Sequence, residues 1–249
     1  MAEIASLKGE QDFLRITDGE AVCYGGDQAW FDFTVGRYGG CGTVAAADLT
    51  AYLAFSVPGG KLHSLYGPEI RRKCGNLSKK DYLAHMNTLY RYVTPWKVPF
   101  VRPDRPAKRH FGWTFGVWPA GRLIRGIRRY AAEHGVTLRG EKISSRKPLS
   151  DLVDFIRDSL RRDCPVAMLI GKRPRYEREM VVRSDGFCWE QTHFAYHWVL
   201  ITKLAKRNGR IMVKVSTWGG YSWLDLEAWH EAGGLIPALV TFRWDTQAD

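Results

Sequence analysis

The sequence predicts an α+β fold in which an N-terminal helical half packs on a C-terminal antiparallel sheet. Two observations support this prediction. Apolar residues recur at helical spacing in several stretches before residue 165, whereas the rest of the chain carries apolar and β-branched runs separated by turn signals. Helices first and antiparallel strands last is an α+β pattern. We therefore expect one domain over residues 1–249, with a helical half at about 24–134 and a sheet half at about 150–249.

Four stretches show the periodicity of helices. The first follows Cys41 and should end near Ser56, because the Pro-Gly-Gly sequence beyond it cannot continue a helix. The second begins at Ser78, whose side chain can cap it. The third, residues 120–134, places apolar residues on one face and arginines on the other, and the fourth opens at Ser150.

The strands are predicted from runs of apolar and β-branched residues. They cover residues 13–16, 166–170, 198–204, 210–216 and 235–244. Two of them are separated by a short polar segment containing Asn208-Gly209, which is typical of an antiparallel hairpin with a tight turn.

Composition limits the classes of protein that the chain can belong to. It has 249 residues, 45% of them hydrophobic and 25% charged, which is ordinary for a globular protein with a sizeable core. There is no apolar run near 18 residues, so no membrane span is expected, and residues 1–11 lack the pattern of a signal peptide. Five widely spaced cysteines without a Cys-x-x-Cys pair favour free thiols in a reducing, cytoplasmic setting.

A glycine-flanked cysteine stands directly before the first predicted helix. Cys41 should lie at the helix N-terminus, where free backbone N–H groups and the helix dipole stabilise a thiolate and lower the pKa of the thiol. Gly39, Gly40 and Gly42 leave room for a substrate or another backbone segment beside the sulfur. The alternative interpretation is a buried structural cysteine beside a loop.

A cysteine nucleophile needs a base, and seven histidines are available. His197 has the most rigid predicted position, because it begins the strand Trp198-Val199-Leu200-Ile201. His193 and His197 are four residues apart without the glutamate of the usual helical zinc motif. Five others are read as surface residues: His63, His85, His110, His134 and His230.

The order of these features resembles the papain-like cysteine peptidase superfamily. It runs from Gln28 through Cys41-Gly42 and a helix to His197-Trp198-Val199, and then to the segment 216–219, Ser-Thr-Trp-Gly. The closer similarity is to the bacteriocin-processing, double-glycine-type peptidases and their relatives. That branch also shows a helix followed by Pro-Val and an apolar strand, like residues 160–170, and the resemblance spans roughly residues 24–229.

The resemblance implies a role for each matching residue. Cys41 would be the nucleophile, His197 the general base and acid, and Gln28 an oxyanion donor beside the backbone N–H of Cys41. Trp218 would cover the histidine and border the substrate cleft with Gly39 and Gly40. The implied reaction is hydrolysis of a peptide or related amide through a thioester, with no metal and no cofactor.

The third position departs from the family pattern. Ser216 stands where papain-like enzymes carry Asn or Asp, and a neutral hydroxyl orients imidazole less firmly than a carboxylate does. A tight turn at Asn208-Gly209 would set Ser216 opposite Ile201, roughly 13 Å from His197. If Ser216 orients His197, we therefore expect a connection of four residues or more, or a bulge that shifts the register near the active end.

Two alternatives remain open on the sequence alone. The same dyad could transfer the acyl group to an amine other than water. Alternatively, the chain could be an inactive, cationic nucleic-acid-binding protein, because its net charge is +11 and residues 102–129 contain eight Arg or Lys against one acid, with aromatic residues between them. Those aromatic residues are Phe111, Trp113 and Phe115. No helix-turn-helix, zinc-finger or RNA-recognition signature is present, so we expect a solvated cationic face that can attract an acidic partner.

Overall fold

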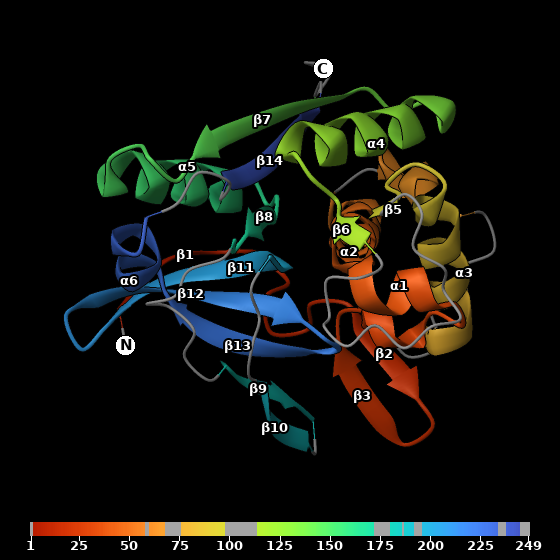
Figure 1. The fold of residues 1–249 in the computed structure, drawn as a ribbon, viewed down its shortest axis with the longest axis horizontal. Coiled ribbons are helices and arrows are strands. Elements are labelled where there is room, and N and C mark those ends of the chain that lie inside the picture. The colour runs from red at the N-terminus through yellow and green to blue at the C-terminus, as the bar shows by residue number, and fades with distance from the viewer. Residues whose placement is uncertain are drawn as a thin grey trace.

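The computed structural model describes residues 2–57, 60–67, 76–97, 114–171, 180–185, 187–191, 196–233 and 238–244. Within these ranges the chain is a mixed α+β protein with a large antiparallel sheet (Figure 1). The α-helices are α1 (Thr34–Gly39), α2 (Cys41–Ser56), α3 (Lys79–Tyr90), α4 (Ala120–Glu133), α5 (Leu149–Arg161) and α6 (Leu226–Glu231). Short 3-10 helices cover Gln28–Trp30 and His63–Leu65.

The strands of the large sheet come from both ends of the chain. They are β1 (Ala2–Ser6), β7 (Leu138–Ser144), β8 (Val166–Leu169), β9 (Met180–Ser184), β10 (Phe187–Gln191), β11 (Trp198–Arg207), β12 (Arg210–Thr217), β13 (Gly220–Asp225) and β14 (Ala238–Trp244). Their order is β10-β9-β13-β12-β11-β8-β14-β7, with β1 beside β11. Smaller sheets contain β2 (Arg15–Asp18), β3 (Ala21–Tyr24) and β4 (Leu77–Ser78), and β5 (Trp96–Lys97) with β6 (Thr114–Gly116).

The expected succession of helices and then strands is therefore only approximate. β1, from the start of the chain, pairs with β11, and β7 forms an edge of the sheet although it precedes α5. The sequence pattern does not predict β7, because charged residues interrupt its apolar alternation. Only its first residue, Leu138, is buried. Its antiparallel pairing with all seven residues of β14 supplies what the local pattern lacks.

Most predicted helices are confirmed. The helix after Cys41 ends at Ser56, and α3 is capped by Ser78, whose hydroxyl accepts the N–H of Asp81. α5 begins at Leu149 rather than Ser150, because Pro148 takes the capping position and its fixed φ suits a helix start. None of the helices among the described residues is long and apolar enough to span a membrane.

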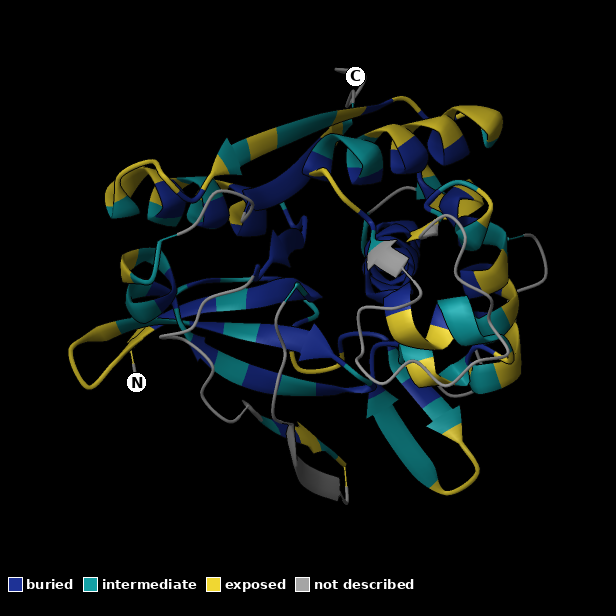
Figure 2. Cartoon of the chain, viewed as in Figure 1, coloured by how far each residue is buried: buried dark blue, intermediate teal, exposed yellow. Residues whose placement is uncertain are grey.

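Helix α2 forms the centre of the molecule. All residues from Cys41 to Ala54 are buried, and this part of the helix, seen nearly end-on in Figure 2, is dark blue. It packs against β11 on one side and α3 and α4 on others. A helix surrounded in this way carries no polar face, and the small side chains at 45–47 allow its neighbours to approach closely.

The β11–β12 hairpin differs from one expectation and meets the other. Asn208 and Gly209 both have positive φ, at 49° and 80°, and Arg207 pairs with Arg210, so the two-residue turn forms and the prediction of a longer connection is wrong. The predicted bulge is present, however. The register shifts between Ile201 and Lys203, which sets Leu200 opposite Ser216.

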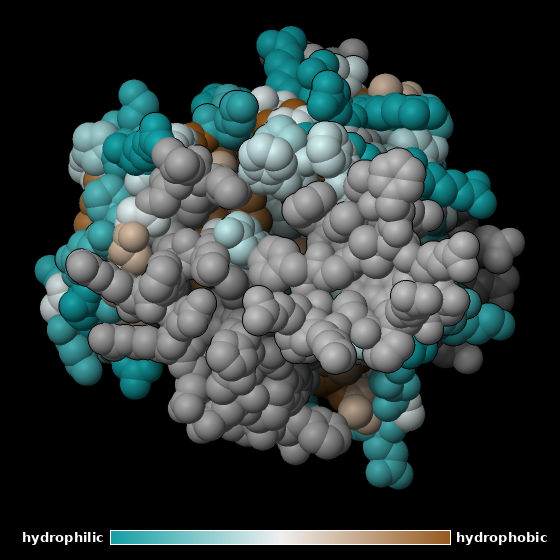
Figure 3. Space-filling model, viewed as in Figure 1, coloured by the Kyte–Doolittle hydropathy of each residue, from teal (hydrophilic) through white to brown (hydrophobic). Residues whose placement is uncertain are grey.

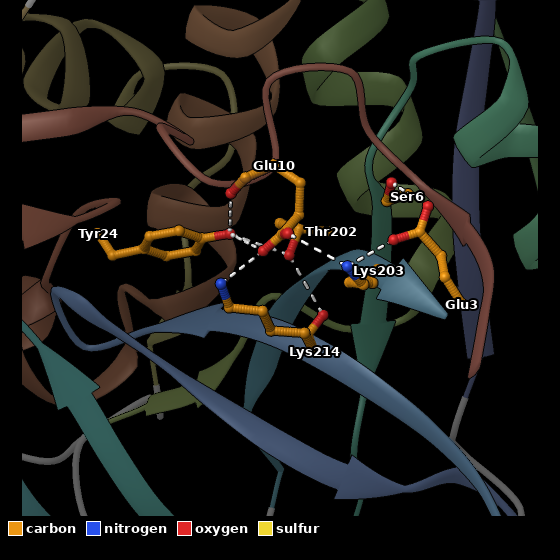
Figure 4. A network of polar contacts seen from close by, with 7 residues as sticks. All are labelled: Glu3, Ser6, Glu10, Tyr24, Thr202, Lys203 and Lys214. Carbon is orange, nitrogen blue, oxygen red and sulfur yellow. Dashed lines mark hydrogen bonds and ion pairs between the residues drawn. The ribbon is translucent and has the colours of Figure 1, made fainter. Parts of the chain in front are cut away.

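Buried polar contacts hold this bulge in place (Figure 4). The hydroxyl of Thr202, the residue skipped by the register, lies 3.1 Å from the Tyr24 hydroxyl and 3.4 Å from the carbonyl oxygen of Lys214. The Tyr24 hydroxyl also donates to the Glu10 carbonyl, and Lys214 forms an ion pair with the Glu10 carboxylate. The network therefore connects the N-terminal segment and β3 with both strands of the hairpin.

In Figure 3, the described residues around the rim of the molecule are mainly hydrophilic. On α4, Arg125, Arg128 and Arg129 are exposed, as the predicted amphipathic pattern requires. Much of the basic and aromatic stretch, residues 98–113, lies outside the described residues, as do His193 and residues 234–237 of the last predicted strand.

Candidate functional site

Cys41 lies at the first residue of α2, where the sequence predicts it. Its side chain is buried, and the backbone N–H groups of Trp198, Gly42 and Cys41 face the sulfur and lower the pKa of the thiol. Burial has the larger effect and raises the pKa above its usual range. The expectation of a lowered pKa is therefore wrong for this conformation, because the helix N-terminus only partly offsets desolvation.

His197 is held immediately before β11 by both its backbone and its ring. Its carbonyl oxygen accepts the N–H of Ile170, 2.9 Å away, at the end of β8. Its ring stacks on Trp218 with centroids 4.0 Å apart and planes 11° apart. Burial lowers the pKa of the imidazole to about 3, so the ring is neutral near pH 7 and is a weaker base than an exposed imidazole.

The hydroxyl that contacts His197 belongs to Thr217, not to Ser216. His197 Nε2 lies 2.7 Å from Thr217 Oγ1. The bulge at Thr202 explains the difference, because a one-residue shift exchanges the faces of a strand. Ser216 instead turns toward the Tyr24 carbonyl oxygen at 3.1 Å. Ser216 is thus not the hydroxyl that contacts His197, and the contact of Thr217 occupies Nε2 rather than Nδ1.

For the hydrolysis proposed in the next subsection, we expect Thr217→Val to lower the turnover number about five- to tenfold, because one neutral hydrogen bond is worth about 1 kcal/mol. Thr217→Ser keeps the hydroxyl and should retain most of the rate. Steady-state kinetics on both variants test this contact. Equal rates for Val and Ser at this position would contradict an orienting role.

Gln28 lies in the 3-10 helix of residues 28–30. Its Nε2 donates to the carbonyl oxygen of Arg37 at 2.7 Å, which fixes the amide orientation because the reverse would bring two oxygens together. The second N–H of the Gln28 amide does not take part in this bond. The Oε1 atom is buried and has no hydrogen-bond partner. A donor from a bound molecule would relieve the cost of that unpaired acceptor.

The glycines on both sides of Cys41 allow close packing and do not border the recess. Gly39 and Gly40 are buried, and a Cβ atom at Gly40 would lie 2.4 Å from the Gly36 carbonyl oxygen and 2.7 Å from the Phe31 ring. A Cβ atom at Gly42 would lie 2.6 Å from the Val117 side chain. Of the three predicted cleft residues, only Trp218 borders the recess that contains Cys41 and His197.

That recess brings most of the predicted site together. Its volume is about 10 Å³, close to the room that one water-sized group needs. Residues that line it include Gln28, Cys41, Asp48, His197, Ser216, Thr217 and Trp218. In the described part of the chain, no three His, Cys, Asp or Glu side chains gather as metal ligands do.

Asp48 and Thr217 are the two site residues that sequence reasoning missed. Asp48 follows Cys41 by seven residues, or about two helical turns, so the two side chains lie on one face of α2. The signal that could have revealed it is that Asp48 is the single charged residue of α2. No comparable local signal distinguishes Thr217 from Ser216, because the choice depends on the bulge.

No family model, no curated protein sequence and no solved structure matches this chain.

Proposed function

We propose that the chain is a papain-like cysteine hydrolase that cleaves a peptide or related amide bond. The observation that carries the proposal is the shared recess. It is lined by a cysteine at the start of a buried helix and by a histidine that is stacked on Trp218 and hydrogen-bonded to Thr217. A nucleophile, a base and a group that orients the base are the parts that such chemistry requires. The packing of α2 against an antiparallel sheet fits the same superfamily.

The pKa directions indicate how the nucleophile forms. Burial raises the pKa of Cys41 and lowers that of His197, so the resting pair is neutral. His197 Nδ1 would take the thiol proton as the sulfur–carbon bond forms, and the carbonyl oxygen becomes an oxyanion. The remaining Gln28 N–H and the Cys41 backbone N–H would stabilise it. Transfer of that proton from His197 to the amide nitrogen breaks the carbon–nitrogen bond and releases the amine. His197 would then take a proton from the water that attacks the thioester and give it to the departing thiolate of Cys41, which restores the thiol.

This mechanism predicts an unusual pH dependence for alkylation of Cys41 by iodoacetamide. If neutral His197 removes the proton, the rate should be nearly constant from about pH 5 to pH 8, because the imidazole protonates only near its pKa of about 3. In His197→Ala the rate should fall about tenfold per pH unit below the raised pKa of the thiol. Mass spectrometry of each cysteine gives the rates.

Cys23 provides an internal control for this experiment. It is a partly exposed, free cysteine, and burial raises the pKa of its thiol. The charged groups that act on this thiol are Asp18, Asp27 and Lys79, none of which is a histidine. Its rate should follow pH in both proteins. Equal rates for all thiols at pH 5, or a first reaction at another cysteine, would overturn the assignment of Cys41 as nucleophile.

The two alternatives give different results in the same preparations. Acyl transfer would yield a new amide when an amine such as glycinamide is added to the substrate mixture. A nucleic-acid binder would bind a single-stranded oligonucleotide with a steep salt dependence and would not respond to Cys41→Ala. The exposed arginines of α4 are the described residues that such binding would use.

A further inference from the structure

We propose that Asp48 is a positioning residue that holds the oxyanion-binding segment and the histidine-orienting strand against the helix of the nucleophile. The proposal rests on the function proposed above and adds a residue that the chemistry itself does not use. It comes from the contacts of one buried carboxyl group with three different parts of the chain.

The first contact reaches the segment that carries Gln28. The backbone N–H of Gly26 donates to Asp48 Oδ1 at 2.9 Å, two residues before Gln28. The turn at 218–219 binds the same segment, because Tyr24 donates its N–H to the Gly219 carbonyl and Gly219 donates to the Gly26 carbonyl, at 2.8 and 2.9 Å. The segment before Gln28 is therefore held by hydrogen bonds to Asp48 and to the 218–219 turn, and the bond to Asp48 is the one that connects it to α2.

The second contact reaches the end of β12. Asp48 Oδ2 lies 3.3 Å from the hydroxyl of Ser216, the residue directly before Thr217. Since Thr217 is the hydroxyl partner of His197, a displacement at Ser216 would move the group that orients the imidazole. The third contact, from the Tyr82 hydroxyl to Oδ1, fixes the carboxyl group from α3.

The number of protons in this cluster suggests which variant can replace Asp48. Oδ1 accepts two donors, Gly26 and Tyr82. The Ser216 hydroxyl has one proton but two neighbouring oxygens, Asp48 Oδ2 and the Tyr24 carbonyl. With an ionised Asp48, Ser216 shares its one proton between the two oxygens; with a proton on Asp48 Oδ2, Asp48 donates to Ser216 and Ser216 donates to Tyr24, so that two separate hydrogen bonds form. An asparagine can form the same pattern, with its Oδ1 accepting twice and its Nδ2 donating to Ser216.

The environment of Asp48 agrees with a protonated carboxyl group. Asp48 is 2% exposed, and burial raises the pKa of its carboxyl to about 7, although Tyr82, Gly26 and Ser216 each lower it. Of the titratable groups, Tyr82 from α3 contacts the carboxyl directly, Cys41 lines the same recess from α2, and His197 lines it from the start of β11. None of the contacts that Asp48 makes involves a basic side chain among the described residues.

The test compares Asp48→Ala with Asp48→Asn and needs no substrate. We expect Asp48→Ala to lower the plateau rate of Cys41 alkylation at pH 5 at least tenfold, so that its pH profile approaches that of His197→Ala. Asp48→Asn should keep the plateau within about threefold. With a peptide substrate, the loss in Asp48→Ala should fall on kcat rather than KM, because no contact to the substrate is removed.

Each outcome decides the proposal. A folded Asp48→Ala with the wild-type plateau would overturn it, and so would Asp48→Asn falling as far as Asp48→Ala. If Asp48→Ala does not fold, Ser216→Ala decides, because it removes the contact of Asp48 to β12, together with the Ser216–Tyr24 hydrogen bond, and leaves the contacts of Asp48 to Gly26 and Tyr82. It should lower the plateau about three- to fivefold, and an unchanged plateau there overturns the proposal. If the wild-type protein shows no His197-dependent plateau, the proposed function itself fails, which is a different result.

Discussion

Cys41→Ala should abolish amide hydrolysis, with a loss in kcat on the order of 10⁵-fold or more, because removal of a nucleophile removes the covalent route entirely. The expected result follows from the position of the sulfur at the start of α2, in the recess shared with His197. The measurement uses a mixture of fluorogenic peptides and a mass-spectrometric search for the acyl-enzyme. His197→Ala should cause a loss of similar size, since the two residues act as one unit.

Cys23→Ala is the matched control for this prediction. Cys23 is also a free cysteine, but it lies on β3 and does not line the recess. Its replacement should leave turnover close to the wild-type value. Hydrolysis that survives in Cys41→Ala would show that the activity belongs to another group or to a contaminant.

Gly25→Ala should destabilise the fold by about 3–5 kcal/mol, because it combines backbone strain with a steric clash. Gly25 has a φ of +79°, which an alanine adopts only with strain. A Cβ atom there would lie 2.2 Å from Ser216 Oγ and 2.7 Å from Asp48 Oδ2. These atoms cannot move away without breaking the contacts that connect α2 to β12. Urea denaturation gives the free energy of unfolding.

Gly19→Ala separates the strain of the backbone from the clash. Gly19 also has a positive φ, +62°, but a Cβ atom there would meet nothing within 4 Å. It should cost only about 1 kcal/mol. If the two variants unfold at the same urea concentration, the packing around Asp48 is looser than the distances indicate.

The sequence was most informative where one segment carries the whole signal. The helix that begins at Cys41 follows from a glycine-flanked start and a run of helix formers, and both are local. The tight turn at Asn208-Gly209 is equally local, and it forms as its residue types predict. A bulge, and not a longer connection, shifts the register of this hairpin. The strand after His197 was predicted from its apolar residues and is present as β11.

Contacts between distant segments decided the remaining features of the site. Thr217 rather than Ser216 meets His197 because Thr202 bulges, and that bulge is held by Tyr24, which is 178 residues away in the chain. The thiol pKa was predicted in the wrong direction because helix position is visible in the sequence, whereas the burial that outweighs it is not.

By itself, the sequence determined the order along the chain of a glycine-flanked cysteine and a histidine before a strand, together with the helix that begins at Cys41 and the strand that follows His197. Periodicity, capping and turn chemistry act over a few residues, so they can be read without the fold. Only the tertiary structure decided which hydroxyl faces the imidazole, how burial shifts the two pKa values, and that Asp48 joins three segments. The partners of Asp48 lie 22, 34 and 168 residues away, and such contacts exist only after the sheet closes over α2.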